Sequence, residues 1–239
     1  MKTVIVTGDS RGLGNNITET LLKDGYKVVG ISRKESDEIK NLKENYENYI
    51  HVNYDLSNSD KIKEFYLKEL KPHGPIHGLV NNAALAYDDI TTNAAIEPLE
   101  KMFKVNVLTA IMLTKYAIRD MMLNDIKGSI VHITSVCAHT GYKGLSMYAA
   151  TKGALESFSK TVAREFGTKK IRSNCIAPGF METSMSKTLS DNQKDRIYKR
   201  TSLKEPTDIQ SVSNTVKFLI DEGSSSITGQ VLHVDNGTI

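Results

Sequence analysis

Residues 7–14 read Thr7-Gly8-Asp9-Ser10-Arg11-Gly12-Leu13-Gly14, between an apolar run at 3–6 and a segment of helical periodicity at 13–23. Glycine lets the backbone turn tightly and approach a ligand with no Cβ in the way. The start of the helix offers unpaired N–H groups and the positive end of the helix dipole. A plain tight turn would show the same glycines. The order strand, glycine turn, helix nevertheless predicts a binding site for the phosphates of a nucleotide.

Apolar runs like the one before the turn recur along the chain. Short runs rich in Val and Ile predict seven strands, at Thr3–Val6, Lys27–Ile31, Tyr49–Val52, Gly78–Val80, Ser129–Ile133, Ile171–Ile176 and Val231–Val234. Helix-period segments alternate with them, at Leu13–Lys23, Asp37–Tyr46, Asp60–Leu70, Leu99–Asn124, Ser146–Phe166 and Thr207–Asp221. The alternation predicts an α/β fold: one Rossmann-type, doubly wound domain over residues 1–239, with a seven-stranded parallel sheet and helices on both faces.

Composition narrows the class of protein. The 239 residues are 39% hydrophobic and 25% charged, which is typical of a globular protein with a sizeable core. A net charge of +3 gives no indication of a nucleic-acid or membrane surface. Two cysteines provide no disulfide framework, the histidines follow no metal-binding pattern, and no apolar run resembles a signal or a membrane span. We therefore expect a cytoplasmic protein without a metal site.

One polar segment, residues 183–205, interrupts the alternation after the sixth strand. Ligands of parallel sheets bind beyond the carboxyl ends of the strands, so this segment is predicted to be a substrate lid. Between residues 184 and 204 it holds six basic residues against two acidic ones. Such a segment is either a solvated helix face or a surface that attracts an anionic substrate or an acidic carrier.

The end of the second strand bears on the choice of dinucleotide. NAD sites usually place an acidic residue there, whereas this strand ends in Ser32-Arg33-Lys34. A guanidinium can clamp the 2′-phosphate of NADP through two parallel hydrogen bonds. Arg33, with Arg11 as a second cation, therefore predicts NADP(H), although basic residues opening a solvated helix would look the same.

A tyrosine and a lysine one helical turn apart form the candidate catalytic pair. Tyr148 and Lys152 stand at i and i+4 of a predicted helix, so they project from one face. A nearby ammonium is expected to lower the phenol's pKa from about 10 and make it a usable proton donor. Because such a pair is common by chance, its weight comes from Ser135, which ends the fifth strand where a ligand would sit and could hold a carbonyl oxygen.

With these residues the chain resembles the short-chain dehydrogenase/reductase family over essentially its whole length. The resemblance implies a catalytic set of Asn106, Ser135, Tyr148 and Lys152. It implies a cofactor set of Gly8, Ser10, Arg11, Gly12, Leu13, Gly14, Arg33, Asp55, Leu56, Asn82, Ala83, Pro178, Gly179, Met181 and Thr183, together with Tyr148 and Lys152. In the family, Asp55 would bind the adenine edge, Asn82 would lie beside the adenine ribose, Asn106 would hold a proton-relay water and Thr183 would fix the nicotinamide amide. Lys152 would also grip the nicotinamide ribose.

Within the family the overall look is nearest to the 3-oxoacyl-[acyl-carrier-protein] reductases, through residues 146–152, 174–180 and 227–230. Sugar, polyol and steroid reductases share these stretches. The expectation is an NADPH-dependent carbonyl reductase acting on a carrier-bound 3-oxoacyl thioester or on a sugar, polyol or other small alcohol. A non-catalytic NADP(H)-binding sensor remains an alternative. The candidate substrate pocket is Cys137, His139, Gly141, Tyr142 and Phe180, with His139 as a second acid-base candidate. The resemblance also implies a homotetramer or homodimer.

Overall fold

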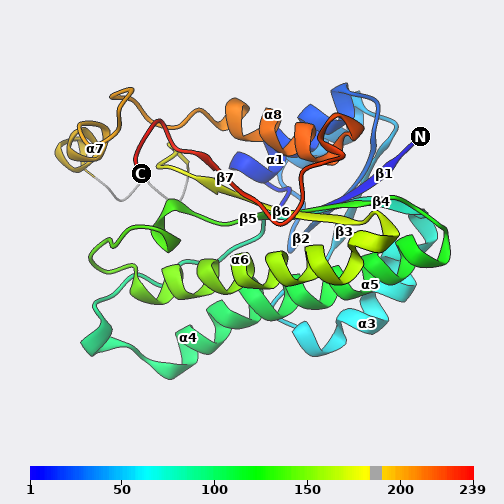
Figure 1. Ribbon diagram of the computed structural model, residues 1–239, viewed down its shortest axis with the longest axis horizontal. Coiled ribbons are helices and arrows are strands. Elements are labelled where there is room, and N and C mark those ends of the chain that lie inside the picture. Colours follow the sequence, from blue (N-terminus) through cyan, green and yellow to red (C-terminus); the bar gives the residue numbers. More distant parts are fainter. Residues whose placement is uncertain (184–189) are drawn as a thin grey trace.

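The computed structural model describes residues 1–183 and 190–239. Its described residues form one parallel sheet of seven strands in the order β3-β2-β1-β4-β5-β6-β7 (Figure 1). The strands are β1 (Thr3–Thr7), β2 (Lys27–Ser32), β3 (Tyr49–Asn53), β4 (Ile76–Asn81), β5 (Ser129–Ile133), β6 (Arg172–Pro178) and β7 (Val231–Val234). The predicted doubly wound fold and each of its strands are thus confirmed.

Alternating side chains of the strands supply two separate cores. In β1, Val4 and Val6 face one cluster of buried residues and Ile5 faces the other, as the two-residue period of a strand requires. Helices α1 (Gly12–Lys23), α2 (Asp37–Asn45) and α8 (Ile209–Ile220) cover the first face. Helices α3 (Ile62–Phe65), α5 (Thr109–Leu123) and α6 (Ser146–Phe166) cover the second, on the lower side of the sheet in Figure 1.

One helix expected to run from 99 to 124 differs from the prediction. It is built as α4 (Ile96–Phe103), a π-helical turn η5 (Lys104–Leu108) and then α5. A second π-helical turn, η2 (Tyr66–Leu70), follows α3. Periodicity cannot distinguish a π turn from an α turn because one extra residue shifts the pattern only locally. Such turns often mark functional sites, and η5 contains Asn106.

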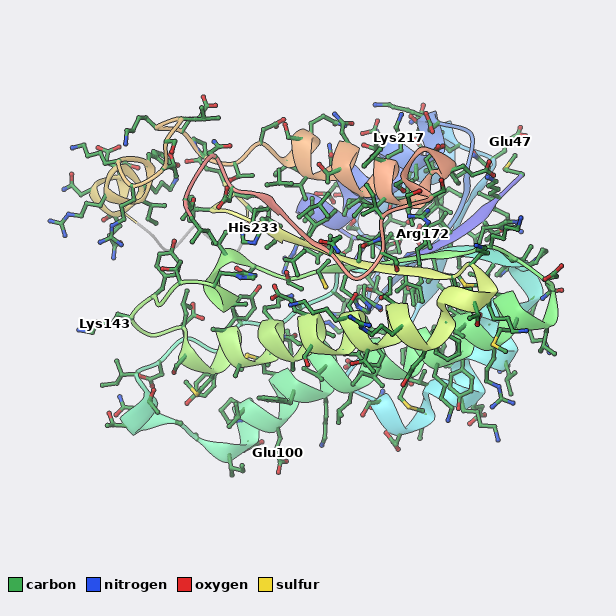
Figure 2. All side chains as sticks on the ribbon, in the orientation of Figure 1. Glu47, Glu100, Lys143, Arg172, Lys217 and His233 are labelled. Carbon is green, nitrogen blue, oxygen red and sulfur yellow. The ribbon has the colours of Figure 1, made fainter. Side chains whose placement is uncertain are left out.

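The apolar residues of α5 are used mainly within the chain itself. Leu113, Ala117 and Met121 are completely buried in the core, while Ile111 and Met112 are half-buried. The three buried residues therefore pack within the chain and are not available for subunit contacts. Figure 2 shows side chains filling the space on both sides of the sheet, with the exposed Glu100 and Lys143 at its periphery.

The direction in which strands are added to the sheet reverses between β1 and β4. The chain moves from β1 outward to β3 and then returns to add β4 on the other side of β1. Ligands bind at such a switch point, beyond the carboxyl ends of the strands. The expected lid contains a helix, α7 (Asp191–Tyr198), that the polar composition did not predict. The part of this lid at 184–189 lies outside the described residues.

Candidate active site

The glycine turn after β1 is shaped for close approach of a ligand. A Cβ on Gly14 would collide with the carbonyl oxygen of Gly8, so the turn can fold back on itself only with glycine there. Helix α1 begins at Gly12, and the preceding Arg11 caps no main-chain N–H with its side chain. The first N–H groups of α1 are therefore available to an anion such as a pyrophosphate. This cradle fits the dinucleotide that the sequence predicts.

Asn82 fastens the end of β4 to this turn. Its amide Nδ2 donates to the carbonyl oxygen of Thr7 at 2.8 Å, and its main-chain N–H donates to the Thr7 hydroxyl at 2.9 Å. The main-chain N–H of Ala83 donates to the same hydroxyl at 3.0 Å. The Asn82 side chain thus holds the two strands at the switch point together, in addition to the ribose contact that family resemblance implies.

The residues expected around the adenosine lie on neighbouring loops. Arg33, directly after β2, is exposed, and its charge helps to lower the pKa of Asp55. The largest cause of that lowered pKa is the hydrogen bond from the main-chain N–H of Ser57, which reaches the carboxylate at 2.9 Å. The neighbouring Leu56 is buried, and its carbonyl oxygen accepts from the Thr109 hydroxyl at 2.6 Å. Asp55 is therefore a carboxylate fixed by its hydrogen bond, and Arg33 is an exposed cation near it.

Helix α6 carries Tyr148 and Lys152 on one face, as their spacing predicts. The Lys152 ammonium lies 5.4 Å from the centre of the Tyr148 ring. It donates to the carbonyl oxygen of Ile133, at the end of β5, at 2.8 Å. Lys152 is 2% exposed, and within the described part of the chain no acidic side chain forms an ion pair with it. This lysine is a buried cation held by a neutral carbonyl.

The expected effect of Lys152 on its neighbour is not found in this structure. Burial raises the pKa of Tyr148 above its usual value, with smaller contributions from Cys137 and Asp88. Burial also lowers the pKa of Lys152 to about 8. The reason is that both groups are shielded from water, which disfavours the charged form of each. Tyr148 is therefore held as a neutral phenol at neutral pH, the form able to donate a proton.

Ser135 lies two residues beyond the end of β5 and caps the short helical turn η6 (Val136–Ala138). Its hydroxyl oxygen accepts from the main-chain N–H of Cys137 at 3.2 Å. Cys137 in turn is close enough to Tyr148 to raise its pKa. Burial raises the pKa of the Cys137 thiol itself, which makes it a poor nucleophile.

Asn106 occupies the π-helical turn η5 and is 1% exposed. Its amide brackets the main chain of Leu85, accepting from the N–H and donating to the carbonyl oxygen, each at 2.8 Å. It also donates to the Thr151 hydroxyl at 3.1 Å, and that hydroxyl donates to the carbonyl oxygen of Tyr148 at 2.7 Å. Because both amide hydrogens are used, the Asn106 side chain positions α6 and has no hydrogen left to donate to a relay water.

Three further candidate substrate residues lie on the loop between β5 and α6. His139 turns to α6, where its Nε2 lies 2.9 Å from Glu156, and its ring centre is 4.5 Å from that of His233 on β7 (labelled in Figure 2). The exposed Gly141 and half-buried Tyr142 follow on the same loop, and the Arg200 charge acts on Tyr142.

Residues 179–183 connect β6 to the expected lid. The Phe180 ring lies 6.0 Å from that of Tyr198 on α7, and Met181 packs on the core. Gly179 follows Pro178 at the end of β6, and a Cβ there would press on Asp235 at 2.8 Å. Thr183 lies over the glycine turn, 4.0 Å from where a Cβ on Gly12 would stand.

Two residues of this site escaped the sequence reasoning. Thr151 links Asn106 to the main chain of Tyr148, and the Ile133 carbonyl receives the Lys152 ammonium. Thr151 stands one residue before the candidate lysine, and its position inside an apolar helix face was the available signal. A main-chain acceptor such as Ile133 leaves no trace in sequence. Within residues 1–183 and 190–239, no cluster of three or more His, Cys, Asp or Glu side chains is arranged for a metal ion. No helix of that part is long and apolar enough to cross a membrane.

Comparison with known proteins agrees with this geometry. Residues 8–238 match a family model described as enoyl-(acyl carrier protein) reductase. The chain is 32% identical to L-xylulose reductase of Caenorhabditis elegans over 238 residues, which cover 99% of this chain and 95% of that protein. It is 33% identical to a 3-oxoacyl-[acyl-carrier-protein] reductase of Escherichia coli over 241 residues, covering 99% and 96%. A solved structure described as ElxO with NADP bound superimposes with a TM-score of 0.91 at 30% identity, covering 99% and 98%. The chain belongs to the short-chain dehydrogenase/reductase family of NAD(P)-dependent oxidoreductases that act on CH–OH or C=O groups.

Proposed function

We propose that this protein is an NADPH-dependent carbonyl reductase in which Tyr148 is the proton donor. The observation that carries the proposal is that Lys152, beside the Tyr148 ring, is anchored to the last carbonyl of β5, two residues before Ser135, while burial keeps Tyr148 a neutral phenol. A protonated acid is the form that reduction of a carbonyl consumes. Arg33, where an NAD site would usually place an acid, supports NADP(H) over NAD(H).

The division of tasks among the residues follows from their chemistry. A nicotinamide cofactor, when bound, supplies the hydride. The Ser135 hydroxyl holds the carbonyl oxygen, on which negative charge grows, and Tyr148 donates its proton to that oxygen. Lys152 places a positive charge beside the phenolate that results, and so stabilises it. Asn106, through Thr151, fixes the turn of α6 that carries both groups.

The substrate class rests on the surroundings of the site. Relatives at similar identity reduce a sugar in one case and a carrier-bound acyl thioester in the other. Arg196 on α7, together with Lys199 and Arg200 just beyond it, is exposed at the lid, and the charge of Arg200 reaches Tyr142 in the candidate pocket. These exposed cations on the lid support a 3-oxoacyl thioester on an acidic carrier as the first candidate. A keto sugar or polyol is the second.

The test is a panel of carbonyl compounds scored by loss of NADPH absorbance. Acetoacetyl thioesters on the carrier protein and on a small thiol are compared with keto sugars. Faster turnover of the carrier-bound thioester, weakened by Arg196→Ala or by added salt, supports the first candidate. Turnover of keto sugars alone moves the assignment to the second candidate. Binding of NADPH without turnover on any compound would contradict the reductase and favour a sensor of NADP(H).

We also propose that the protein assembles into a homotetramer or homodimer. The apolar residues exposed along η5 and α5 support this, since Leu108 and Met122 are close to half exposed and Leu123 is 77% exposed. Exposed apolar side chains on one long helix are suited to packing against a second copy. Light scattering that gives the mass of a monomer at micromolar concentration would contradict it.

A further inference from the structure

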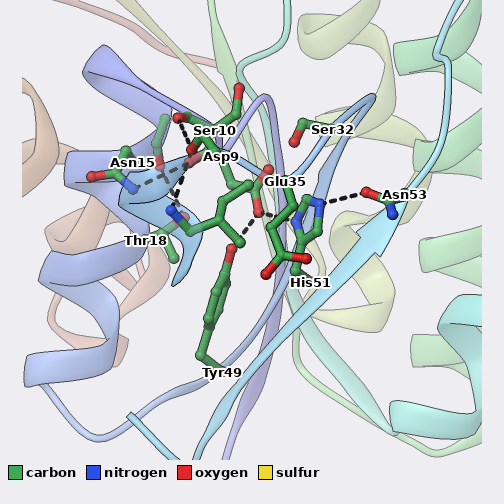
Figure 3. Close-up of polar contacts among 12 residues, drawn as sticks. Asp9, Ser10, Asn15, Thr18, Ser32, Glu35, Tyr49, His51 and Asn53 are labelled. Atoms are coloured by element: carbon green, nitrogen blue, oxygen red, sulfur yellow. Dashed lines mark hydrogen bonds and ion pairs between the residues drawn. The ribbon is translucent and has the colours of Figure 1, made fainter. Parts of the chain in front are cut away.

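A buried acidic side chain lies inside the glycine turn, although negative charge there repels the phosphates of a bound nucleotide. Asp9 is 0% exposed and follows Gly8 directly. Its Oδ2 accepts from the Tyr49 hydroxyl at 2.6 Å and lies 2.8 Å from Nδ1 of His51 (Figure 3). Its Oδ1 is buried and has no hydrogen-bond partner within the described residues. The turn that faces the cofactor's phosphates is thus tied to β3 through a carboxylate.

The geometry of the sheet explains why the three side chains meet. Tyr49 and His51 are two residues apart on β3, so they project from the same face. In the parallel pairing, His51 stands beside Gly30 of β2. A Cβ on Gly30 would collide with the carboxylate of Asp9, so this glycine leaves the space that Asp9 fills. The cluster therefore depends on residues from three segments: the turn after β1, strand β2 and strand β3.

Both nitrogens of His51 face oxygen atoms. Nδ1 faces the Asp9 carboxylate, and Nε2 lies 2.9 Å from the amide oxygen of Asn53. Two acceptors suit the imidazolium form, because only the protonated ring donates from both nitrogens. Burial alone would lower the pKa of His51, but the hydrogen bond and charge of Asp9, aided by Asn53, hold it above its usual value. The side chain of His51 is 1% exposed, so its charge is poorly screened by water.

Within the described residues, the charges that act on this pair come from the elements packed against it. Asp9 comes from the turn after β1, and Tyr49, whose pKa burial raises above its usual value, comes from β3. Lys43 of α2 acts on His51 in the opposite sense to Asp9. Lys43 is itself paired at 3.0 Å with Glu35, whose charge also acts on Tyr49. The charges of Lys43 and Glu35 balance each other, so the charge of Asp9 is balanced by the proton of His51.

We propose that Asp9 and His51 are positioning residues that set cofactor affinity: protonated His51 neutralises Asp9 under the phosphate-binding turn, and loss of that proton weakens dinucleotide binding. With His51 neutral, a buried carboxylate with one bare oxygen repels the cofactor's phosphates at low effective dielectric. With His51 charged, the pair is neutral and the turn keeps its shape. The inference rests on the proposed cofactor site, because it concerns the affinity of that same turn.

The experiment is calorimetric titration of NADPH into three proteins at pH 6.5, 7.5 and 8.5. These are the unmodified chain, Asp9→Asn, which keeps the shape and removes the charge, and His51→Gln, which keeps a donor and cannot be protonated. The 2′-phosphate and Lys152 also titrate in this range, but they do so equally in all three proteins. The ratio of dissociation constants between proteins therefore isolates the pair.

We expect the unmodified chain to lose about five- to tenfold in affinity relative to Asp9→Asn between pH 6.5 and 8.5, a coupling of ordinary size. His51→Gln should bind at pH 6.5 as weakly, relative to Asp9→Asn, as the unmodified chain does at pH 8.5. Three parallel pH profiles, or an Asp9→Asn protein that binds more weakly than the unmodified chain, would overturn the proposal and leave a purely structural cluster.

A second measurement needs no variant that might fail to fold. Because linkage is reciprocal, NADPH must raise the pKa of the His51 ring by the same factor by which its proton raises affinity. Nuclear magnetic resonance of the ring in free and NADPH-saturated protein should show that rise, and an unchanged or lowered value contradicts the proposal. Repeating the titrations with NADH tests the choice of NADP(H) separately from the role of the Asp9–His51 pair. NADH bound more tightly than NADPH would refute the cofactor assignment, while the pH effect, which needs only the shared pyrophosphate, is still measured.

Discussion

The two halves of the site each bury a charged side chain, and they treat it differently. In the turn half, β1 to β3 with the glycine turn, Asp9 is held by a tyrosine hydroxyl and by a histidine that can carry the opposite charge. In the catalytic half, β4 to β6 with α6, Lys152 donates to the neutral carbonyl of Ile133, and burial lowers its pKa to about 8. The charge of Asp9 is balanced only while its ionisable partner keeps a proton. The charge of Lys152 has no ionisable partner among the described residues and is opposed by burial.

This contrast predicts separate consequences of mutation. Changes in the turn half should alter the affinity for cofactor and leave the chemical step nearly intact. Changes at Tyr148 should do the opposite, because its phenol meets substrate only during proton transfer. The predictions below follow from that separation.

The largest effect is expected from Tyr148→Phe, which keeps the ring and removes the acid. General-acid catalysis contributes about a hundred- to ten-thousandfold, so kcat should fall by about that factor. The affinity for NADPH should be nearly unchanged. Steady-state rates and calorimetry on the same preparation measure both. If kcat stays near its original value while chemistry limits the rate, the proton donor lies elsewhere, with His139 the first residue to test.

Gly30→Ala should cost about 3 kcal/mol of folding stability, because its Cβ would collide with the Asp9 carboxylate. Combining it with Asp9→Ala should restore part of that stability, since the second change removes the obstructing group. Denaturant unfolding of the two single variants and the double variant gives the coupling. Strictly additive losses would show that Gly30 and Asp9 do not compete for the same space.

Arg33→Ala tests the outer edge of the turn half. Removing a charge-assisted pair with the 2′-phosphate should weaken NADPH binding by about ten- to a hundredfold, or about 1.5–3 kcal/mol. NADH lacks that phosphate and should bind almost as before. Calorimetry with both cofactors makes the comparison, and equal losses for the two would remove Arg33 from the recognition of NADP(H).

The smallest effect is a gain in stability from Lys152→Met. Burial opposes the ammonium, so an apolar side chain of similar length should raise the free energy of unfolding by about 1–2 kcal/mol at pH 7. The folded pKa lies below that of the unfolded chain, so the original protein becomes more stable as pH rises from about 8 towards about 10. The advantage of the variant should shrink over that window. A difference that is constant between pH 7 and pH 10 would mean that Lys152 is not a strained cation.

The sequence predicted the doubly wound parallel sheet and the placement of Tyr148 and Lys152 on one helix face, because both depend on short-range spacing. It could not predict that burial raises the pKa of Tyr148, since desolvation depends on every element packed around the phenol. The Asp9 cluster was missed for a related reason. Asp9, Gly30 and His51 lie on three separate segments, and only the register of β2 and β3 brings them together. An acid inside a phosphate-binding turn was nevertheless a visible sign.

The separation of binding from chemistry is tested most directly by a double-mutant cycle on kcat/KM for NADPH, with Arg33→Ala, Tyr148→Phe and their combination. If the two halves act independently, the loss in the double variant equals the product of the single losses, with a coupling within about 0.5 kcal/mol. A double variant no worse than Tyr148→Phe alone would contradict the account, because it would mean that Arg33 acts through the catalytic step.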